Sequence, residues 1–296
     1  MSGFLSRYSQ RNEETNGHQV VTRPVADGLA GCETIPWGCG SVIVNADDWG
    51  RDTENTDRSL ECALRESISS VSAMVFMEDS ERAAFLARLH GIDVGLHLNL
   101  TTPFLPSLCS SRVVEHQARI IHFLRSHRLS RVVYHPGLAS SFDYVVHAQL
   151  EEFQRLYGVP ANRIDGHHHM HLCANVVHQK IIPAGTIVRR NFSFWPGEKN
   201  YANRIYRQWQ DRRIARRHRV ADYLFSLTQL KSRDRLERVL KLASYFNVEI
   251  ETHPVNSEEY SVLVNGEINS PIGKARIARG YRLCCRNAVG NVDTIV

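Results

Sequence analysis

From residue 40 onward, short apolar runs alternate with stretches of helical periodicity, and this alternation constrains the fold more than any other feature of the chain. The first run, at 41–44, reads Ser-Val-Ile-Val without polar alternation, as expected of a strand covered on both faces. Further strands are expected at 71–76, 92–99, 163–167, 186–189, 220–227 and 247–252. Because strands that alternate with helices form parallel sheets, and the repeats continue without a break in composition, we expect an α/β fold with one closed or nearly closed β/α barrel.

Helix signals fall between these runs. Asp52 or Thr53 can cap a helix in which Leu60, Ala63 and Leu64 follow the i, i+3, i+4 spacing of an apolar stripe. Further helices are expected to begin at 79–80, to run over 142–156 before Gly158, and to span 232–246.

The N-terminal segment differs from the rest of the chain. Residues 1–39 are polar and show no sustained periodicity, so we expect a flexible extension followed by a single barrel domain over 40–296. No stretch approaches the roughly 18 to 20 apolar residues of a membrane span, and the N-terminus lacks the apolar core of a secretory signal. The 7 cysteines are scattered without a Cys-x-x-Cys pair, which favours reduced packing residues over a disulfide framework. We expect a cytoplasmic protein without a membrane partner.

Residues suited to chemistry follow the predicted strands. The segment Asn-Ala-Asp-Asp-Trp-Gly at 45–50 comes directly after the first one. The adjacent carboxylates Asp47 and Asp48 repel one another unless a cation or proton lies between them, and neighbouring side chains on an extended backbone diverge. One can therefore bind a metal while the other handles protons. The alternative is an acidic surface turn that caps the next helix.

A second segment, Gly-Leu-His-Leu-Asn-Leu-Thr at 95–101, carries His97 on the same strand face as Gly95 and Asn99. A histidine between two such residues, on one side of an otherwise apolar strand, is well placed to face a cavity. Taken alone, a histidine in such a position is more often a hydrogen-bonded core residue than a metal ligand.

The strongest local signal is Asp-Gly-His-His-His-Met-His at 165–171. Imidazole is the commonest neutral metal ligand in proteins, and adjacent histidines offer lone pairs with little positive charge. In an extended segment residues 165, 167, 169 and 171 share a face, so they reach one ion together only if the strand ends and bends. A surface cluster that binds metal adventitiously is the alternative.

A fourth segment ends the strand predicted at 247–252. Glu249, Glu251 and His253 share one face, and Pro254 restricts the backbone after the histidine. In this position His253 could donate a proton to a leaving group.

Taken together, these segments indicate a single site, because loops that leave the carboxyl ends of parallel strands meet at one mouth. One aspartate and two histidines from three strand ends form the three-ligand arrangement, with an open position, of a hydrolytic metal site. A second carboxylate and a further imidazole then remain for base and acid.

The four segments, the last being Thr-His-Pro at 252–254, make the chain resemble the YdjC-like, or ChbG/HpnK, carbohydrate deacetylases over residues 41–260. The resemblance implies a distorted β/α barrel related to the polysaccharide deacetylases. It also implies a metal-dependent hydrolase in which metal-activated water removes acetyl groups from N-acetylated sugars, such as oligosaccharides or glycoconjugates of N-acetylglucosamine.

The family roles map onto individual residues of this chain. The resemblance places the metal on Asp48, His97 and His167, the general base at Asp47, the general acid at His253, and Arg189 or Arg190 against the base or the substrate. The family is described with Mg²⁺, whereas a carboxylate with two imidazoles favours Zn²⁺, Co²⁺ or Mn²⁺ on affinity grounds.

An arginine-rich run at 204–219 leaves a second function class open, a protein that binds nucleic acid or another polyanion. Apolar residues are interleaved with the arginines, namely Tyr201, Ile205, Tyr206, Trp209 and Ile214. We favour an amphipathic helix whose basic face is solvated or contacts a second subunit in a homodimer, and expect no nucleic-acid partner. A barrel that binds metal without catalysis is the third alternative.

Overall fold

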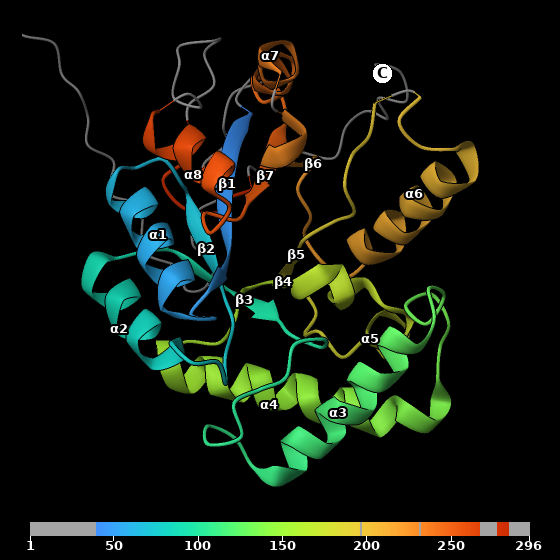
Figure 1. The fold of residues 1–296 in the computed structure, drawn as a ribbon. Helices are drawn as coiled ribbons and strands as arrows, with labels where there is room; N and C mark the ends of the chain where they lie inside the picture. Colours follow the sequence, from blue (N-terminus) through green and yellow to red (C-terminus); the bar gives the residue numbers. More distant parts are fainter. Residues whose placement is uncertain (1–39, 196, 231, 267–276, 284–296) are drawn as a thin grey trace, which may run out of the picture. The chain divides into compact units, whose positions relative to one another are not determined.

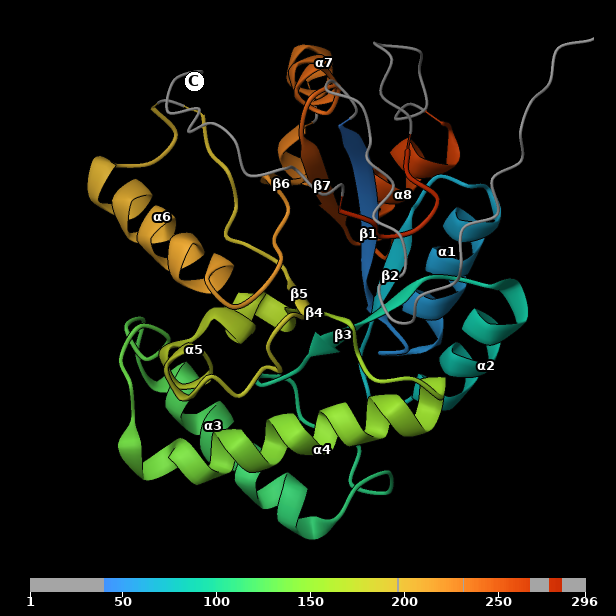
Figure 2. The ribbon, with the colours of Figure 1, turned by 180° about the vertical axis from the view of Figure 1, so that it is seen from behind.

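The computed structural model describes residues 40–195, 197–230, 232–266 and 277–283 (Figures 1 and 2). The flexible extension predicted for residues 1–39 lies outside the described residues. Among the helices within these ranges, none combines the length and the apolar character that crossing a membrane requires.

The described residues contain one seven-stranded sheet in which every paired strand is parallel. In chain order the strands are β1 (Ser41–Trp49), β2 (Ser70–Ala73), β3 (Val94–Leu98), β4 (Arg163–Gly166), β5 (Ile187–Val188), β6 (Tyr223–Ser226) and β7 (Asn247–Thr252). Their spatial order is β5-β4-β3-β2-β1-β7-β6 (Figure 1). The parallel α/β fold predicted from the alternating runs is therefore confirmed.

The barrel is distorted at the seam between its edge strands, β5 and β6. Ile187 of β5 forms a parallel bridge with Arg219, which precedes β6, and the Val188 amide donates to the Arg219 carbonyl at 2.9 Å. Beyond β5, the Ser193 amide donates to the Leu224 carbonyl at 2.8 Å. These few hydrogen bonds, rather than a continuous ladder, connect the two edges.

The helices follow the strands in β/α order and lie outside the sheet (Figures 1 and 2). They are α1 (Thr53–Leu64), α2 (Ser80–His90), α3 (Ser111–Ser126), α4 (Ala139–Tyr157), α5 (Ala174–Gln179), α6 (Tyr201–Ala215), α7 (Arg233–Leu242) and α8 (Ser257–Val264). Helix α1 packs on β1, α4 packs on β3, and α3 packs against α4. Three short 3-10 helices complete the set: η1 (Pro136–Leu138), η2 (His167–Leu172) and η3 (Leu227–Leu230).

Several helix ends lie where the sequence places them. Asp52 caps α1 by accepting a hydrogen bond from the Asn55 amide, and Gly158 ends α4 in the left-handed conformation at φ 75°. The predicted apolar stripe of α1 is wrong at its end, because Leu64 is 58% exposed while Ser59 and Cys62 are buried. The sheet selects the face of α1, and that face carries small side chains.

Other boundaries differ from the prediction. Strand β2 ends at Ala73 rather than at 76, and Phe76 adopts a positive φ of 59°, which takes the backbone out of the sheet. Strand β4 ends at Gly166, so His167 begins η2 instead of extending the strand. Helix α7 ends at Leu242 rather than at 246. After β2 the apolar run continues into a buried loop at 74–77, whereas the histidine tract follows β4 directly.

Side chains along β1 alternate between two cores. Val42 and Val44 belong to the large apolar cluster shared with the helices, whereas Ile43 belongs to a small cluster with Tyr281 and Leu283. The segment 277–283 reaches this small cluster by pairing with β1, because the Ala278 amide donates to the Val42 carbonyl at 2.8 Å. Apolar side chains therefore fill the barrel at the amino ends of its strands.

The next inward-facing layer is polar. Arg163 is buried and donates to Asn45 Oδ1 at 2.9 Å, to Ser72 Oγ at 3.0 Å and to the Val71 carbonyl at 2.8 Å. Its guanidinium fills the space that a Cβ on Gly95 would enter, since that atom would lie 2.6 Å from Arg163 Cζ. This layer supports the residues at the carboxyl ends of the strands.

Candidate active site

The end of β1 sends two adjacent carboxylates to different partners. The pairing register of β1 with β2 shifts between Ala46 and Trp49, and Asp48 adopts a left-handed φ of 65°. This irregularity turns Asp47 toward Arg189 and Asp48 toward His97 and His167. Both aspartates are buried. The two adjacent carboxylates therefore diverge, as expected for neighbouring side chains, and the backbone geometry at the end of β1 is the cause.

Asp48, His97 and His167 form the first cluster at the barrel mouth. The distance from Asp48 Oδ1 to His97 Nε2 is 3.3 Å, and the distance to His167 Nδ1 is 3.0 Å. One ligand atom from each of the three residues lies within 4.8 Å of the others. The other oxygen, Asp48 Oδ2, accepts from Arg51 at 3.0 Å, which leaves Oδ1 for the cluster. These side chains could hold a metal ion.

The hydrogen bonds of His97 show that this cluster fits a cation. Its Nδ1 lies 2.7 Å from Asp165 Oδ1, so a neutral ring donates there and directs the Nε2 lone pair at Asp48. Asp48 Oδ1 and His97 Nε2 are both buried and lack a hydrogen-bond partner among the described residues. Two facing lone pairs repel unless a cation or a proton lies between them.

The pKa values of His97 and Asp48 reflect the charges around them. Burial disfavours the charged form of His97, but the negative charge of Asp47, followed by the nearby carboxylates of Asp165 and Asp48, outweighs it and raises its pKa to about 10. Burial opposes ionisation of Asp48 as well, yet the adjacent imidazoles of His167 and His97 hold its pKa well below the usual range. The cluster is therefore built around a buried carboxylate that attracts positive charge.

Arg189 joins the second group of acids. Its side chain is 1% exposed, and it binds Asp47 through both terminal nitrogens, at 2.6 Å to Oδ2 and 2.8 Å to Oδ1. The same guanidinium lies 2.7 Å from Glu249, 3.1 Å from Glu251 and 3.1 Å from Asp165. One buried cation thus organises four carboxyl groups.

The carboxyl groups around Arg189 do not share one protonation state. Burial opposes ionisation of Asp47, but Arg189 and His97 hold its pKa below the usual value. Burial raises the pKa of Glu251 well above its usual value, and the charge of Asp47 raises it further. The pKa values of these two neighbouring carboxyl groups are therefore shifted in opposite directions, which favours the ionised form of Asp47 and the neutral form of Glu251.

The two predicted arginines have different positions. Arg189 lies inside the barrel among the acids. Arg190 leaves the barrel, pairs with Asp211 of α6 at 2.9 Å, and donates to the backbone carbonyl of Asp222. The structure therefore brings Arg189 into the cluster and leaves Arg190 outside it.

The histidine tract bends as soon as β4 ends. His168 and His169 both adopt positive φ angles, 55° and 58°, so the chain bends after Gly166 and the histidines do not share one extended face. A Cβ on Gly166 would lie 2.9 Å from His171 Nδ1, so the close packing of η2 on β4 requires glycine there.

As a result each histidine has its own partner. His167 contacts Asp48, whereas His168 Nδ1 lies 2.9 Å from the Thr101 hydroxyl. The remaining two contacts are His169 Nε2 with Glu251 at 3.3 Å, and His171 Nε2, which donates to the Arg189 carbonyl at 2.9 Å. Burial, followed by the charge of Arg189, lowers the pKa of His169 well below its usual value. One of the four histidines therefore reaches Asp48.

His253 follows β7 and lies at the edge of the mouth. It forms a cluster with Asp47 and Glu251 in which one ligand atom of each lies within 4.8 Å of the others. Its backbone amide donates to Glu259 Oε2 at 2.6 Å, and the Thr252 hydroxyl donates to the same oxygen at 2.8 Å. The ring is only partly buried, so His253 faces both the acids and solvent.

Sequence reasoning did not assign roles to Asp165, Glu249 and Glu251. Alternation along the strand could have identified them, because Asp165 shares the strand face of His167 and both glutamates share the strand face of His253. Alternation along a strand predicts which side chains point into the barrel, but it does not identify the buried arginine that they contact.

Comparisons with known proteins agree with this fold. Residues 41–276 match the family model described as YdjC-like protein. A carbohydrate deacetylase from Mus musculus is 30% identical over 143 residues, covering 46% of this chain and 44% of that protein. A chitooligosaccharide deacetylase from Proteus mirabilis is 30% identical over 155 residues, covering 48% of this chain and 57% of that protein. The chain thus spans about half the length of the curated relatives it matches.

A solved structure supports the architecture. A protein from Enterococcus faecalis, proposed to cleave cellobiose phosphate, superposes with a TM-score of 0.53 at 18% identity. The match covers 78% of this chain and 92% of that one. At this identity the likeness concerns the fold alone.

Proposed function

The chain belongs to the YdjC-like protein family, and from that premise we propose that it is a metal-dependent hydrolase that removes acetyl groups from N-acetylated sugars. The names of the two curated relatives support a carbohydrate substrate that carries an acetamido group. The proposal therefore concerns hydrolysis of an amide bond to release acetate and a free amine.

The observation that carries the proposal is the pair of partnerless buried atoms, Asp48 Oδ1 and His97 Nε2, which face one another beside His167. We assign Asp48, His97 and His167 as the ligands of one divalent cation. When bound there, such an ion would polarise the acetyl carbonyl and lower the pKa of water toward about 7.

The neighbouring residues supply proton transfers. Asp47 accepts the proton of the attacking water at a carboxylate oxygen, and Arg189 fixes the orientation of that carboxylate through two hydrogen bonds. His253, which is partly exposed, gives a proton to the departing amine nitrogen. In this assignment Arg189 is a positioning residue and touches no substrate atom.

The donor set bears on which ion is bound. A carboxylate and two imidazoles suit Zn²⁺, Co²⁺ or Mn²⁺, whereas Mg²⁺, implied by the resemblance, prefers oxygen ligands. Metal availability then decides the occupant. Elemental analysis of the purified protein identifies the ion that copurifies.

Acetate release tests the function directly. N-acetylglucosamine oligosaccharides of several lengths are incubated with the protein, and acetate and free amine are measured with and without a chelator. We expect equal amounts of the two products, loss of both with chelator, and recovery when a divalent ion is restored. Release that persists undiminished after complete removal of metal would contradict the proposal.

Neighbouring histidines provide a matched pair of variants. His167→Asn removes a proposed ligand, and its acetate release should fall by more than the ~100-fold expected for loss of an outer-sphere partner. His168→Asn makes the same chemical change one residue later, at a positive φ that asparagine tolerates, and should keep most of the activity. Equal losses in both variants would argue against a specific role of His167.

A further inference from the structure

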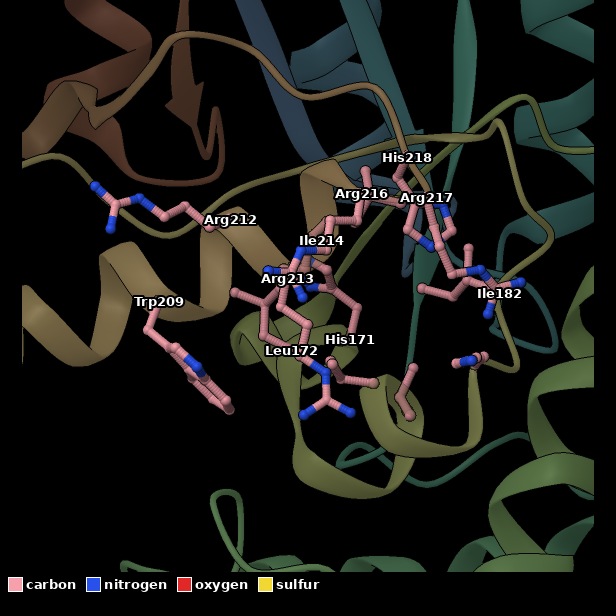
Figure 3. A pocket seen from close by; sticks show the side chains of 14 residues that line it. His171, Leu172, Ile182, Trp209, Arg212, Arg213, Ile214, Arg216, Arg217 and His218 are labelled. Carbon is pink, nitrogen blue, oxygen red and sulfur yellow. The ribbon is translucent and has the colours of Figure 1, made fainter. Parts of the chain in front are cut away.

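A second cavity lies outside the barrel, between α5, α6 and the segment that leads into β5 (Figure 3). Its volume is about 640 Å³, within the range of small-molecule sites. One wall is the end of η2, because His171 and Leu172 line the cavity while His167, at the start of the same short helix, contacts Asp48. We call this cavity the α6 pocket.

Basic side chains surround the α6 pocket. Lys180, Arg212, Arg213, Arg216 and Arg217 line it, and none of the described residues lining it is acidic. Within the described part of the chain these five side chains form no ion pair with a carboxylate. Arg217 also has a buried terminal nitrogen that finds no hydrogen-bond partner among the described residues.

The imidazoles beside Arg213 and Arg217 respond to the positive charge of these arginines. Arg213 contacts the imidazole of His178, with nitrogen separations of 3.2 and 3.4 Å, instead of an acid. Burial and then the charge of Arg213 lower the pKa of His178, and burial and then Arg217 lower the pKa of His218. Burial and a neighbouring arginine thus both favour the neutral form of each imidazole.

The helix dipole accounts for part of this basic cluster. Cations near a helix carboxyl terminus are favourable, and Arg212 and Arg213 lie in the last turn of α6. Lys180 follows α5, however, and Arg217 lies beyond the end of α6, so the pocket gathers cations from separate segments. Stabilisation of α6 alone does not require their convergence on one cavity.

The floor of the pocket is apolar, and an aromatic ring stands at its edge. Leu172, Val176 and Ile214 are buried and line the cavity. Trp209 lines it as well, with 53% of its surface exposed, and the Arg213 guanidinium lies 5.6 Å from the centre of its ring (Figure 3). An exposed indole beside a guanidinium offers a stacking surface for a flat ring.

We propose that the α6 pocket binds a nucleoside phosphate, with its phosphates on the unpaired arginines and its base against Trp209 and the apolar floor. The unmatched positive charge selects phosphate, because arginine binds its oxygens through charge-assisted hydrogen bonds. The bounded volume favours one nucleotide over a strand of nucleic acid, because Trp209 is the one Phe, Tyr or Trp among the described residues that line the pocket, and a strand would need a row of stacking side chains within it.

Calorimetric titration of the full chain with ATP, adenosine and inorganic tripolyphosphate tests the proposal. ATP should bind with one site per chain, adenosine should give no measurable heat, and tripolyphosphate should bind at least about tenfold more weakly than ATP. Absence of ATP binding, or equal binding of ATP and tripolyphosphate, would overturn the proposal.

Two substitutions separate charge from stacking. Arg213→Glu should weaken ATP binding at least about tenfold, whereas Arg204→Glu, the same charge change on α6 at a residue that does not line the pocket, should leave it nearly unchanged. Trp209→Ala should weaken ATP about tenfold without changing the affinity for tripolyphosphate. Equal losses for Arg213→Glu and Arg204→Glu would show a general surface effect and contradict a built site.

Single-stranded RNA serves as the competing ligand. If the pocket is a nucleotide site, ATP displaces RNA from it, and Trp209→Ala weakens both. Tight RNA binding that ATP does not displace would assign these arginines to an extended nucleic-acid surface and overturn the proposal.

Discussion

The barrel mouth and the α6 pocket both concentrate charge, but they balance it in opposite ways. In the mouth, one fully buried guanidinium, Arg189, lies among four carboxyl groups. In the α6 pocket, five lysine and arginine side chains line a cavity that no described acid lines. The first region has an excess of negative charge and suits a cation, whereas the second has an excess of positive charge and suits an anion.

The two regions also differ in how deeply their charges are buried, and this affects the stability of the fold. A buried charge that loses its partner retains the full cost of its desolvation, whereas an exposed charge is compensated by water. The mouth residues are therefore coupled to the stability of the fold, and the pocket residues are free to serve a ligand. The following substitutions test this difference.

The largest effect is expected from Arg189→Met, which leaves Asp47, Glu249, Glu251 and Asp165 buried without their shared cation. The free energy of unfolding should fall by about 3 to 5 kcal/mol, measured by urea denaturation. Arg217→Met, the same substitution in the α6 pocket, should change it by no more than about 0.5 kcal/mol. Similar losses in the two variants would remove the distinction between the regions.

A smaller effect is expected from Asp165→Asn. Asp165 accepts the Nδ1 proton of His97 and thereby points Nε2 at Asp48, so this change should weaken divalent-metal affinity about 10- to 100-fold. Equilibrium dialysis against a metal of known activity measures it. Asp143→Asn, on the exposed side of α4, is the matched control and should leave affinity unchanged. An unchanged affinity in Asp165→Asn would show that His97 needs no such partner.

The smallest effect is expected from Arg216→Gln. Removing one of several unpaired cations relieves mutual repulsion, so the protein should become more stable by no more than about 0.5 kcal/mol, and the gain should shrink as salt is added. Urea denaturation at low and high ionic strength measures both. Destabilisation by more than 1 kcal/mol would mean that Arg216 has a structural partner.

Much of the mouth follows from local sequence rules. Alternation along the strands and the convergence of parallel strand ends together predict that side chains from distant segments meet at the mouth, and the structure places Asp47 near both His97 and His253. These rules succeed because they depend only on the two-residue period of a strand and on the parallel arrangement of the strands. Both features can be recognised from the runs of apolar residues in the sequence.

The rest depends on contacts between distant segments. The register shift at the end of β1 and the left-handed His168 and His169 have no composition signal, because neither aspartate nor histidine marks such a turn as glycine does. The convergence of the acids on Arg189 is equally non-local, since Asp47 lies 142 residues away in the chain. No rule of spacing connects them.

Helix α6 shows a different limit. The helix predicted for the arginine-rich run is present, yet its interleaved aromatic residues do not form a buried face. Tyr201 and Trp209 are exposed, while Gln210 and Asp211 are buried and make hydrogen bonds. Partners in neighbouring segments, Arg190 and the Leu172 carbonyl, select this polar face, and helical periodicity alone cannot show them.

The central claim is that Asp48, His97 and His167 hold one divalent ion, and the metal content of three purified proteins tests it most directly. The unmodified protein and Asp47→Asn should each contain about one divalent ion per chain, but only the unmodified protein should release acetate. Asp48→Ala should contain no bound ion and should be inactive. An Asp48→Ala protein that retains a full equivalent of metal, or hydrolyses substrate at the unmodified rate, would contradict the account.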